Sequence, residues 1–137
     1  MKKLAPLLFL TLSTTFAFAQ CDDRYQAEIF NSVTVTEVNY SDNIQDSYHK
    51  MDIYTPDGDT EINRPIILYM HGGSFYGGTK VMTDCVDFCT SMAKRGYITA
   101  SLNYRLSTLW DFLSSQEEQY ITVLKAVADA KSAIRYF

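Results

Sequence analysis

The chain has 137 residues, which is enough for one domain of ordinary size. Its 16 acidic residues outnumber its 12 basic residues, so that the formal net charge at pH 7 is −4. An acidic surface argues against binding to nucleic acids and to anionic membranes, but it does not identify a ligand.

Residues 1–19 have the pattern of a secretory signal peptide. Lys2 and Lys3 give a positively charged start, residues 4–18 are mostly apolar, and Ala17-Phe18-Ala19 is a small-x-small cleavage site. The segment is too short for a membrane span and has the wrong flanks, which disfavours a retained anchor. We therefore expect export to the periplasm or the extracellular space, with cleavage after Ala19.

The mature chain is then expected to start at Gln20. A lipoprotein signal that ends at Cys21 is a further alternative, but Gln20 is a poor residue directly before a lipidated cysteine. Loss of the two lysines of the signal peptide leaves 10 basic and 16 acidic residues, a net charge of −6.

Three cysteines remain in the mature chain, Cys21, Cys85 and Cys89. In an oxidising compartment a disulfide can persist, and an odd count leaves at least one thiol free or paired outside the chain. A disulfide between Cys85 and Cys89 would be strained within one predicted helix, so we expect core thiols or a bond from one of them to Cys21. The two histidines, His49 and His71, stand far apart, and no metal-ligand spacing is present.

Two strands are predicted at the start of the mature chain. Residues 32–40, SVTVTEVNY, are rich in β-branched residues and alternate in character, and residues 49–54, HKMDIY, alternate again. The polar residues 41–47 suit a connection, so the two strands are expected to pair in antiparallel fashion. Residues 55–58 then have turn chemistry, with a Pro that presets φ and a Gly that accepts a positive φ.

A continuous apolar run, PIILYM at residues 65–70, predicts a third strand that is buried on both faces, as in a parallel sheet. Residues 71–78, HGGSFYGG, follow directly. Four glycines among seven residues predict a loop that needs unusual backbone angles or a close approach of another group to the backbone.

A helix is predicted next, over residues 82–95, with a C-terminal cap at Gly96. Residues 97–102 have the pattern of a strand and residues 103–110 that of a loop. A last helix begins with capping-box patterns at residues 114–115. Its apolar residues recur along one helical face: Tyr120, Val123, Leu124, Val127, Ile134 and Phe137.

The order of these elements indicates the fold class. Strands that alternate with helices imply βαβ crossovers and a mainly parallel sheet. The chain ends on the apolar face of its last helix, and four strands within 118 residues would leave sheet edges uncovered. We therefore expect residues 20–137 to be the N-terminal portion of a larger domain.

The glycine-rich loop also has a chemical interpretation. Enzymes that transfer acyl groups must stabilise an oxyanion, and backbone N–H groups do this well because they are fixed before the reaction begins. Glycines allow the chain to lie close to a substrate and to turn its amides towards it. A glycine-rich turn with no catalytic role is the alternative for this motif.

The sequence resembles the α/β-hydrolase superfamily, in its carboxylesterase/lipase branch, which has an HGGG-type loop after the third strand. The resemblance runs from about residue 50 to the end of the chain, and it depends on the order and spacing of several motifs together. These motifs are Met51–Pro56, Arg64-Pro65, His71-Gly72-Gly73, Ala93–Tyr97, Ser101–Leu106 and Ala126–Phe137.

The resemblance implies the N-terminal part of an α/β-hydrolase fold, with a mainly parallel sheet, antiparallel first strands and flanking helices. It implies that the backbone amides of Gly72, Gly73 and Ser74 form part of an oxyanion hole, and that His71 shapes the loop. Ser74 stands where the family usually has Gly, but its amide remains available.

The neighbouring residues have less specific interpretations. Phe75 and Tyr76 are candidates for lining a substrate pocket, or for packing beside the loop. Arg105 is expected to be structural, and Asp129 and Arg135 are expected to have an ion-pair or surface role.

Ser74 is not expected to be the nucleophile. The nucleophile elbow of the superfamily is G-x-S-x-G, and in residues 72–77 the second Gly comes one position too late. The triad order is Ser, then acid, then His, so all three residues are expected beyond Phe137, and His71 is not the catalytic base.

We therefore predict an exported serine hydrolase that acts on small-molecule carboxylic esters through an acyl-enzyme, with no metal, cofactor, nucleic-acid partner or membrane span. Residues 20–137 alone would have the oxyanion loop without the triad, and are expected to be inactive and to fold poorly. A peptidase on the same fold and a catalytically inactive binding protein are the alternatives. The sequence does not indicate the natural substrate, the acyl or alcohol specificity, or the oligomeric state.

Overall fold

The computed structural model describes residues 23–137 of the chain. The predicted signal peptide, its cleavage site and Cys21 lie outside the described residues.

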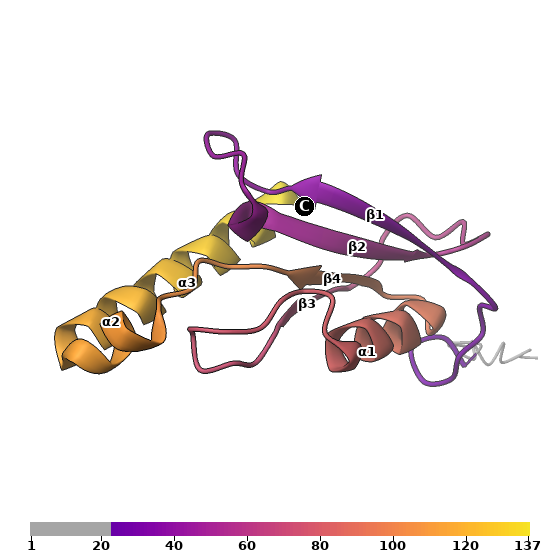
Figure 1. Ribbon diagram of the computed structural model, residues 1–137. Coiled ribbons are helices and arrows are strands. Elements are labelled where there is room, and N and C mark those ends of the chain that lie inside the picture. Colours follow the sequence, from indigo (N-terminus) through magenta and orange to yellow (C-terminus); the bar gives the residue numbers. More distant parts are fainter. Residues whose placement is uncertain (1–22) are drawn as a thin grey trace, which may run out of the picture.

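A four-stranded mixed sheet organises the described residues (Figure 1). In spatial order the strands are β1 (Val33–Asn39), β2 (Lys50–Pro56), β4 (Ile98–Leu102) and β3 (Ile66–Met70). β1 and β2 are antiparallel, as predicted, β2 and β4 are also antiparallel, and β3 and β4 are parallel. The predicted α/β fold class, with antiparallel first strands and flanking helices, is confirmed. The predicted mainly parallel sheet is wrong for the described residues, because only the β3–β4 pair is joined by a helical crossover and runs parallel.

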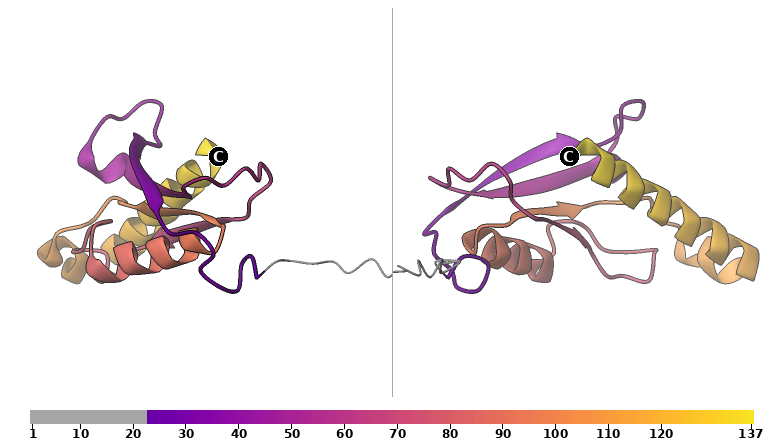
Figure 2. Two further views of the ribbon diagram at one scale, coloured as in Figure 1. Left: turned by 90° about the vertical axis from the view of Figure 1, so that its right-hand side faces the viewer. Right: turned by 180° about the vertical axis from the view of Figure 1, so that it is seen from behind.

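Helices cover both faces of this sheet (Figures 1 and 2). α1 (Thr83–Lys94) connects β3 to β4 and lies against one face, whereas the long α3 (Gln116–Tyr136) crosses the other. The predicted cap at Gly96 is confirmed, because this residue ends α1 with φ 98°. A single turn of 3-10 helix, η1 (Ser47–His49), leads into β2.

A short helix, α2 (Leu109–Ser114), lies between β4 and α3. The predicted loop over residues 103–110 is therefore wrong at its end. Thr108 caps this helix, with its Oγ1 accepting from the backbone N of Asp111 at 3.1 Å, and this Thr-x-x-Asp pattern is the missed signal. The predicted cap at Ser115 is confirmed, because its Oγ accepts from the backbone N of Glu118 at 3.2 Å.

The core has one part on each face of the sheet. On the α3 side, Met51 of β2 and residues 100 and 102 of β4 pack with Ala126 and Ala133. On the α1 side, Tyr54 packs with helix residues 89 and 93. The thiols of Cys85 and Cys89 are free and fully buried on this side, and burial raises the pKa of Cys89 to about 11.

The burial predicted for residues 65–70 is wrong in the described structure. β3 lies at the edge of the sheet, and Ile66 and Met70 are 47% and 37% exposed. A continuous apolar run shows that a strand is hydrophobic. The number of strands that lie beside that strand depends on the topology of the sheet.

The apolar face predicted for α3 lies towards solvent. Tyr120, Leu124 and Ile134 are 70%, 67% and 62% exposed. Small or polar side chains face the sheet instead, which allows the helix to lie close to the strands. The buried residues of α3 are Thr122, Ala126, Asp129 and Ala133.

The segment before β1 is tied to the turn after β2 by an ion pair. Both Nη atoms of Arg24 donate to the carboxylate of Asp59, whose side chain is 3% exposed. The hydrogen bond from Arg24 lowers the pKa of Asp59, although burial opposes this effect. The ionised carboxylate therefore stabilises the folded state.

We expect this stabilisation to be present above pH 4, near the ordinary carboxyl pKa of about 3.9, and to be lost as the pH falls through the lower folded pKa. Replacing Asp59 with Asn should lower the free energy of unfolding at pH 7 and flatten its dependence on pH below 4. Urea unfolding between pH 2 and pH 7 measures this. Replacing Asp87 with Asn, on the exposed side of α1, is the control, and equal pH profiles for the two variants would contradict the prediction.

Candidate active site

The candidate site begins where β3 ends. Residues 71–78 form a loop that follows β3 directly and extends past the end of the sheet, on the side where α2 lies (Figure 1). In α/β folds, ligands bind at the carboxyl ends of the parallel strands. The loop is therefore placed to contact a substrate.

The loop turns sharply on itself. The amides of Tyr76 and Gly77 both donate to the carbonyl oxygen of Gly73, at 3.1 and 3.0 Å. Gly73 has φ 122°, and a Cβ added to it would collide with the carbonyl oxygen of Gly77. Conformation and space both exclude a side chain at position 73.

The next two residues have a Cβ, yet their backbone also lies in the left-handed region of φ and ψ. Ser74 has φ 53° and Phe75 has φ 65°. Such angles are uncommon for residues with a Cβ, and they cost of order 1–3 kcal/mol each when the surrounding structure imposes them. The loop is thus held in a strained conformation.

Three consecutive amides of the loop have no partner. Within residues 23–137, no oxygen accepts a hydrogen bond from the backbone N–H of Gly72, Gly73 or Ser74, and all three residues are exposed. Consecutive free N–H groups can bind an anion or an oxyanion. The structure therefore brings together the amides that the sequence predicts for the oxyanion hole, and their use in catalysis stays a prediction.

His71 lies under the loop. It is 3% exposed, its ring stacks on that of Tyr104 at 4.4 Å between centroids, and its Nδ1 lies 2.7 Å from the carbonyl oxygen of Gly72. Since a carbonyl oxygen can only accept, Nδ1 must be the protonated nitrogen. This geometry agrees with the loop-shaping role predicted for His71.

The two aromatic residues of the loop differ in exposure. Phe75 packs against the core beside Tyr104 and Phe112, and its carbonyl oxygen accepts from the backbone N of Ser107 at 2.8 Å. Tyr76 is 42% exposed and contacts the edge of the same cluster. Phe75 thus anchors the loop, and Tyr76 is the better candidate for contact with a substrate.

Tyr104 and Asn103, directly after β4, hold the first residue of the loop and the residues that follow its end, and no sequence motif indicates this role. The hydroxyl of Tyr104 donates to the carbonyl oxygen of His71 at 2.7 Å. Oδ1 of Asn103 accepts from the backbone N of Lys80 at 2.7 Å, and its Nδ2 donates to the carbonyl of Ser47 at 2.8 Å. The one sequence feature that could have indicated this role is the position of these two residues, at the carboxyl end of the strand that is parallel to β3.

A pocket of about 320 Å³ adjoins the loop at this end of the sheet. It combines hydroxyl groups, an amide and aromatic rings, and it shares two residues with the loop. Its lining residues are Ser47, Tyr48, His71, Gly78, Thr79, Asn103, Tyr104 and Leu106.

Neither histidine is paired with a serine hydroxyl within residues 23–137. His49 is buried, with Nδ1 2.7 Å from Asp46 and Nε2 3.6 Å from Asp129. Asp129 also binds the guanidinium of Arg105, with Nη2 2.7 Å from Oδ1, so Asp129 forms an ion pair, one of the two roles expected for it, and Arg105 has a structural contact. In this part of the chain, no group of three or more His, Cys, Asp or Glu is arranged to hold a metal ion, and no helix is long and apolar enough to cross a membrane.

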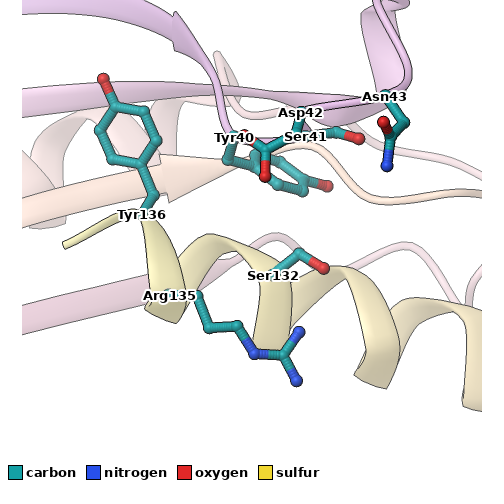
Figure 3. Close-up of a pocket in the computed structure, with 7 residues that line it drawn as sticks. All are labelled: Tyr40, Ser41, Asp42, Asn43, Ser132, Arg135 and Tyr136. Atoms are coloured by element: carbon teal, nitrogen blue, oxygen red, sulfur yellow. The ribbon is translucent and has the colours of Figure 1, made fainter.

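A separate pocket of about 280 Å³ lies between the β1–β2 connection and the last turns of α3. Figure 3 shows that the guanidinium of Arg135 points away from Tyr40 and Asp42. The polar groups of this pocket do not converge on one point, and Arg135 has the surface position that was expected.

Comparison with known proteins decides the family. The model of the family described as BD-FAE matches residues 51–137, more than half of the chain. The chain belongs to the BD-FAE family. The match includes all of β2 except Lys50, then β3, the glycine-rich loop and all elements that follow, and it confirms the resemblance to the α/β-hydrolase esterases.

Two solved structures are similar to this BD-FAE family chain. One is a truncated form of a carbohydrate esterase from gut microbiota, with 21% identity and a TM-score of 0.53, over 80% of this chain and 33% of the other. The second is a bacterial heroin esterase, with 27% identity and a TM-score of 0.45, over 72% of this chain and 31% of the other. The chain thus spans about a third of the length of these esterases, and the first likeness supports the fold. No curated protein matches the chain.

The strained Ser74 allows a test of its role. Replacing Ser74 with Gly should preserve activity in the complete gene product, because only the backbone amide is required. It should raise the free energy of unfolding by roughly 1 kcal/mol, because relief of the strain at φ 53° exceeds the added chain entropy of Gly in the unfolded state. Kinetics with a nitrophenyl ester and urea unfolding measure the two effects. If the variant loses covalent labelling by an active-site phosphonate, Ser74 is the nucleophile and the assignment is wrong.

Proposed function

We propose that the complete gene product is a serine hydrolase of the carboxylesterase type, which cleaves carboxylic esters through an acyl-enzyme. One observation carries the proposal: three consecutive unpartnered amides, at Gly72, Gly73 and Ser74, follow β3 within the segment that matches the BD-FAE family. When a nucleophile attacks an ester carbonyl, negative charge develops on its oxygen. Fixed N–H groups stabilise that charge without having to reorganise.

The proposed mechanism requires a nucleophile that these 137 residues do not supply. No G-x-S-x-G elbow occurs in the sequence. The proposal therefore places the Ser, the acid and the His in a longer parent protein, outside the 137 residues. The amide that follows the nucleophile would then supply the remaining oxyanion donor, and no metal or cofactor takes part.

The aromatic residues beside the loop suggest how an ester would be held. Tyr76 is partly exposed next to the free amides, and the 320 Å³ pocket opens on the side of His71 and Tyr104. We propose that Tyr76 contacts the substrate, whereas Phe75 supports the loop from below.

Export is a separate part of the proposal. The motif Ala17-Phe18-Ala19 supports cleavage after Ala19. Sequencing of the secreted protein should give an N-terminus at Gln20 or its cyclised form. An uncleaved N-terminus or a lipidated Cys21 would contradict it.

The experiment for the whole proposal uses the complete gene product. It should hydrolyse nitrophenyl acetate, and a fluorophosphonate should label one serine in a G-x-S-x-G sequence, identified by peptide mass spectrometry. Acetylated sugars and peptide amides are tested in parallel. Hydrolysis of the peptides alone would indicate a peptidase, and the absence of both labelling and turnover would indicate an inactive binding protein.

A further inference from the structure

The three free amides belong to three consecutive peptide units. A trans peptide is planar, so its C=O and N–H groups point in opposite directions. The carbonyl of His71 shares a peptide with the N–H of Gly72, the carbonyl of Gly72 with the N–H of Gly73, and that of Gly73 with the N–H of Ser74. A group that fixes one of these carbonyls therefore also aims the N–H on the other side.

Each of the three carbonyls has a donor. Tyr104 donates its hydroxyl to the carbonyl of His71, and His71 donates Nδ1–H to the carbonyl of Gly72, both at 2.7 Å. The carbonyl of Gly73 accepts from the amides of the loop itself. The first two peptides thus depend on side chains, and these two rings stack on each other with an angle of 19°.

The peptide between His71 and Gly72 can change its orientation unless a neighbouring group holds it. It can flip by a coupled change of ψ at His71 and φ at Gly72, and glycine accepts the new φ without steric cost. A flip would turn the N–H of Gly72 towards Tyr104 and remove it from the outer face of the loop. The hydroxyl of Tyr104 is the group that opposes this flip.

We propose that Tyr104 is a positioning residue for the oxyanion hole, which acts by fixing the carbonyl of His71 and thereby aiming the N–H of Gly72. The proposal depends on the proposed ester hydrolysis, and Tyr104 itself does not touch the substrate. It is 3% exposed and follows β4, the strand beside β3, which places its ring under the loop. Burial raises the pKa of Tyr104, so its hydroxyl keeps the proton that it donates.

The test is Tyr104→Phe in the complete gene product, which removes the hydroxyl and keeps the stacked ring. If the N–H of Gly72 no longer points at the oxyanion, kcat should fall roughly 10- to 100-fold. KM should stay nearly unchanged, because the oxyanion forms only in the transition state. Binding of a boronic acid, whose adduct is tetrahedral, should weaken by a similar factor. Active-site titration corrects for any loss of folded enzyme.

Thr99→Val is the matched control. It removes another buried hydroxyl that donates to a main-chain carbonyl, that of Cys89 at 2.8 Å, on the α1 side of the sheet and away from both the glycine loop and the pocket beside it. Its cost in stability should be similar, with little change in kcat. Equal losses of kcat per active site in the two variants would overturn the proposal.

An NMR measurement keeps the proposal testable if no ester is hydrolysed. The amide resonance of Gly72 should shift in Tyr104→Phe and not in Thr99→Val. In the wild-type protein, the hydroxyl proton of Tyr104 should exchange slowly enough to be observed, whether or not the variant folds. If the Gly72 resonance does not shift, or if the hydroxyl proton exchanges rapidly, the positioning role of Tyr104 is wrong. If the resonance shifts and the hydroxyl proton exchanges slowly but no ester is hydrolysed, only the proposed function is wrong.

Discussion

Replacing Gly73 with Val is expected to lower kcat for ester hydrolysis by the complete gene product by roughly 100-fold or more, which is about the contribution of one oxyanion donor. Gly73 has φ 122°, which a β-branched residue does not adopt, and an added Cβ would collide with the carbonyl oxygen of Gly77. The turn must therefore open, and the amides of residues 73 and 74 lose their direction. Steady-state kinetics measure the change in kcat, and thermal unfolding measures the change in stability in parallel. The loss of activity should be the larger of the two effects.

Gly77 offers a matched control within the same turn. A Cβ on Gly77 would lie at an ordinary distance of 3.8 Å from the carbonyl oxygen of Gly73, and the residue has no positive φ. Gly77→Ala should therefore keep most of the activity. Near wild-type kcat in Gly73→Val would show that the amides of this loop do not bind the oxyanion.

Replacing Asp129 with Ala is expected to reduce the free energy of unfolding by about 1–3 kcal/mol, because the buried carboxylate is the acceptor for the backbone N–H of Arg105, whereas the side chain of Arg105 is 36% exposed and its guanidinium can be solvated by water. The carboxylate is 2% exposed and binds both the backbone N of Arg105, at 2.9 Å, and its guanidinium. His49 faces the same carboxylate. Urea unfolding of the complete gene product at pH 7 measures the loss.

An exposed ion pair provides the comparison for Asp129. Glu28 accepts from Ser91 and lies 4.0 Å from Lys94 at the surface, so Glu28→Gln should cost at most about 1 kcal/mol. Asp129→Asn keeps one acceptor oxygen and should fall between the two variants. A loss below 1 kcal/mol in Asp129→Ala would mean that the pair with Arg105 does not support the fold.

Local patterns were sufficient for most of the elements. Alternation over residues 32–40 and 49–54 predicts the antiparallel pair β1–β2, and Gly96 ends α1 as predicted. The start of α2 was missed because Thr108 and Asp111 form a cap without a long apolar stripe behind it. Short helices have little periodicity, so their caps are the only local signal.

Burial could not be predicted in the same way. The continuous apolar run of β3 predicts a strand that is buried on both faces, yet Ile66 and Met70 are exposed, because the burial of a strand depends on which other elements pack against it. The most hydrophobic stripe of α3 faces solvent, and the stripe that contains Ala126 and Ala133 faces the sheet. Both outcomes depend on distant partners, and a local window of sequence does not contain them.

The sequence by itself determined the family resemblance, the order of the strands and of the two longer helices, and the position of the glycine-rich loop directly after β3, because each of these depends on motifs of residues that are close together in the chain. The oxyanion role of Gly72, Gly73 and Ser74 stays a prediction from that resemblance. Only the tertiary structure decided what holds those amides. Tyr104 binds the carbonyl of His71 from 33 residues away. A hydrogen bond over such a separation forms only when β3 and β4 pair in parallel and bring their carboxyl ends together.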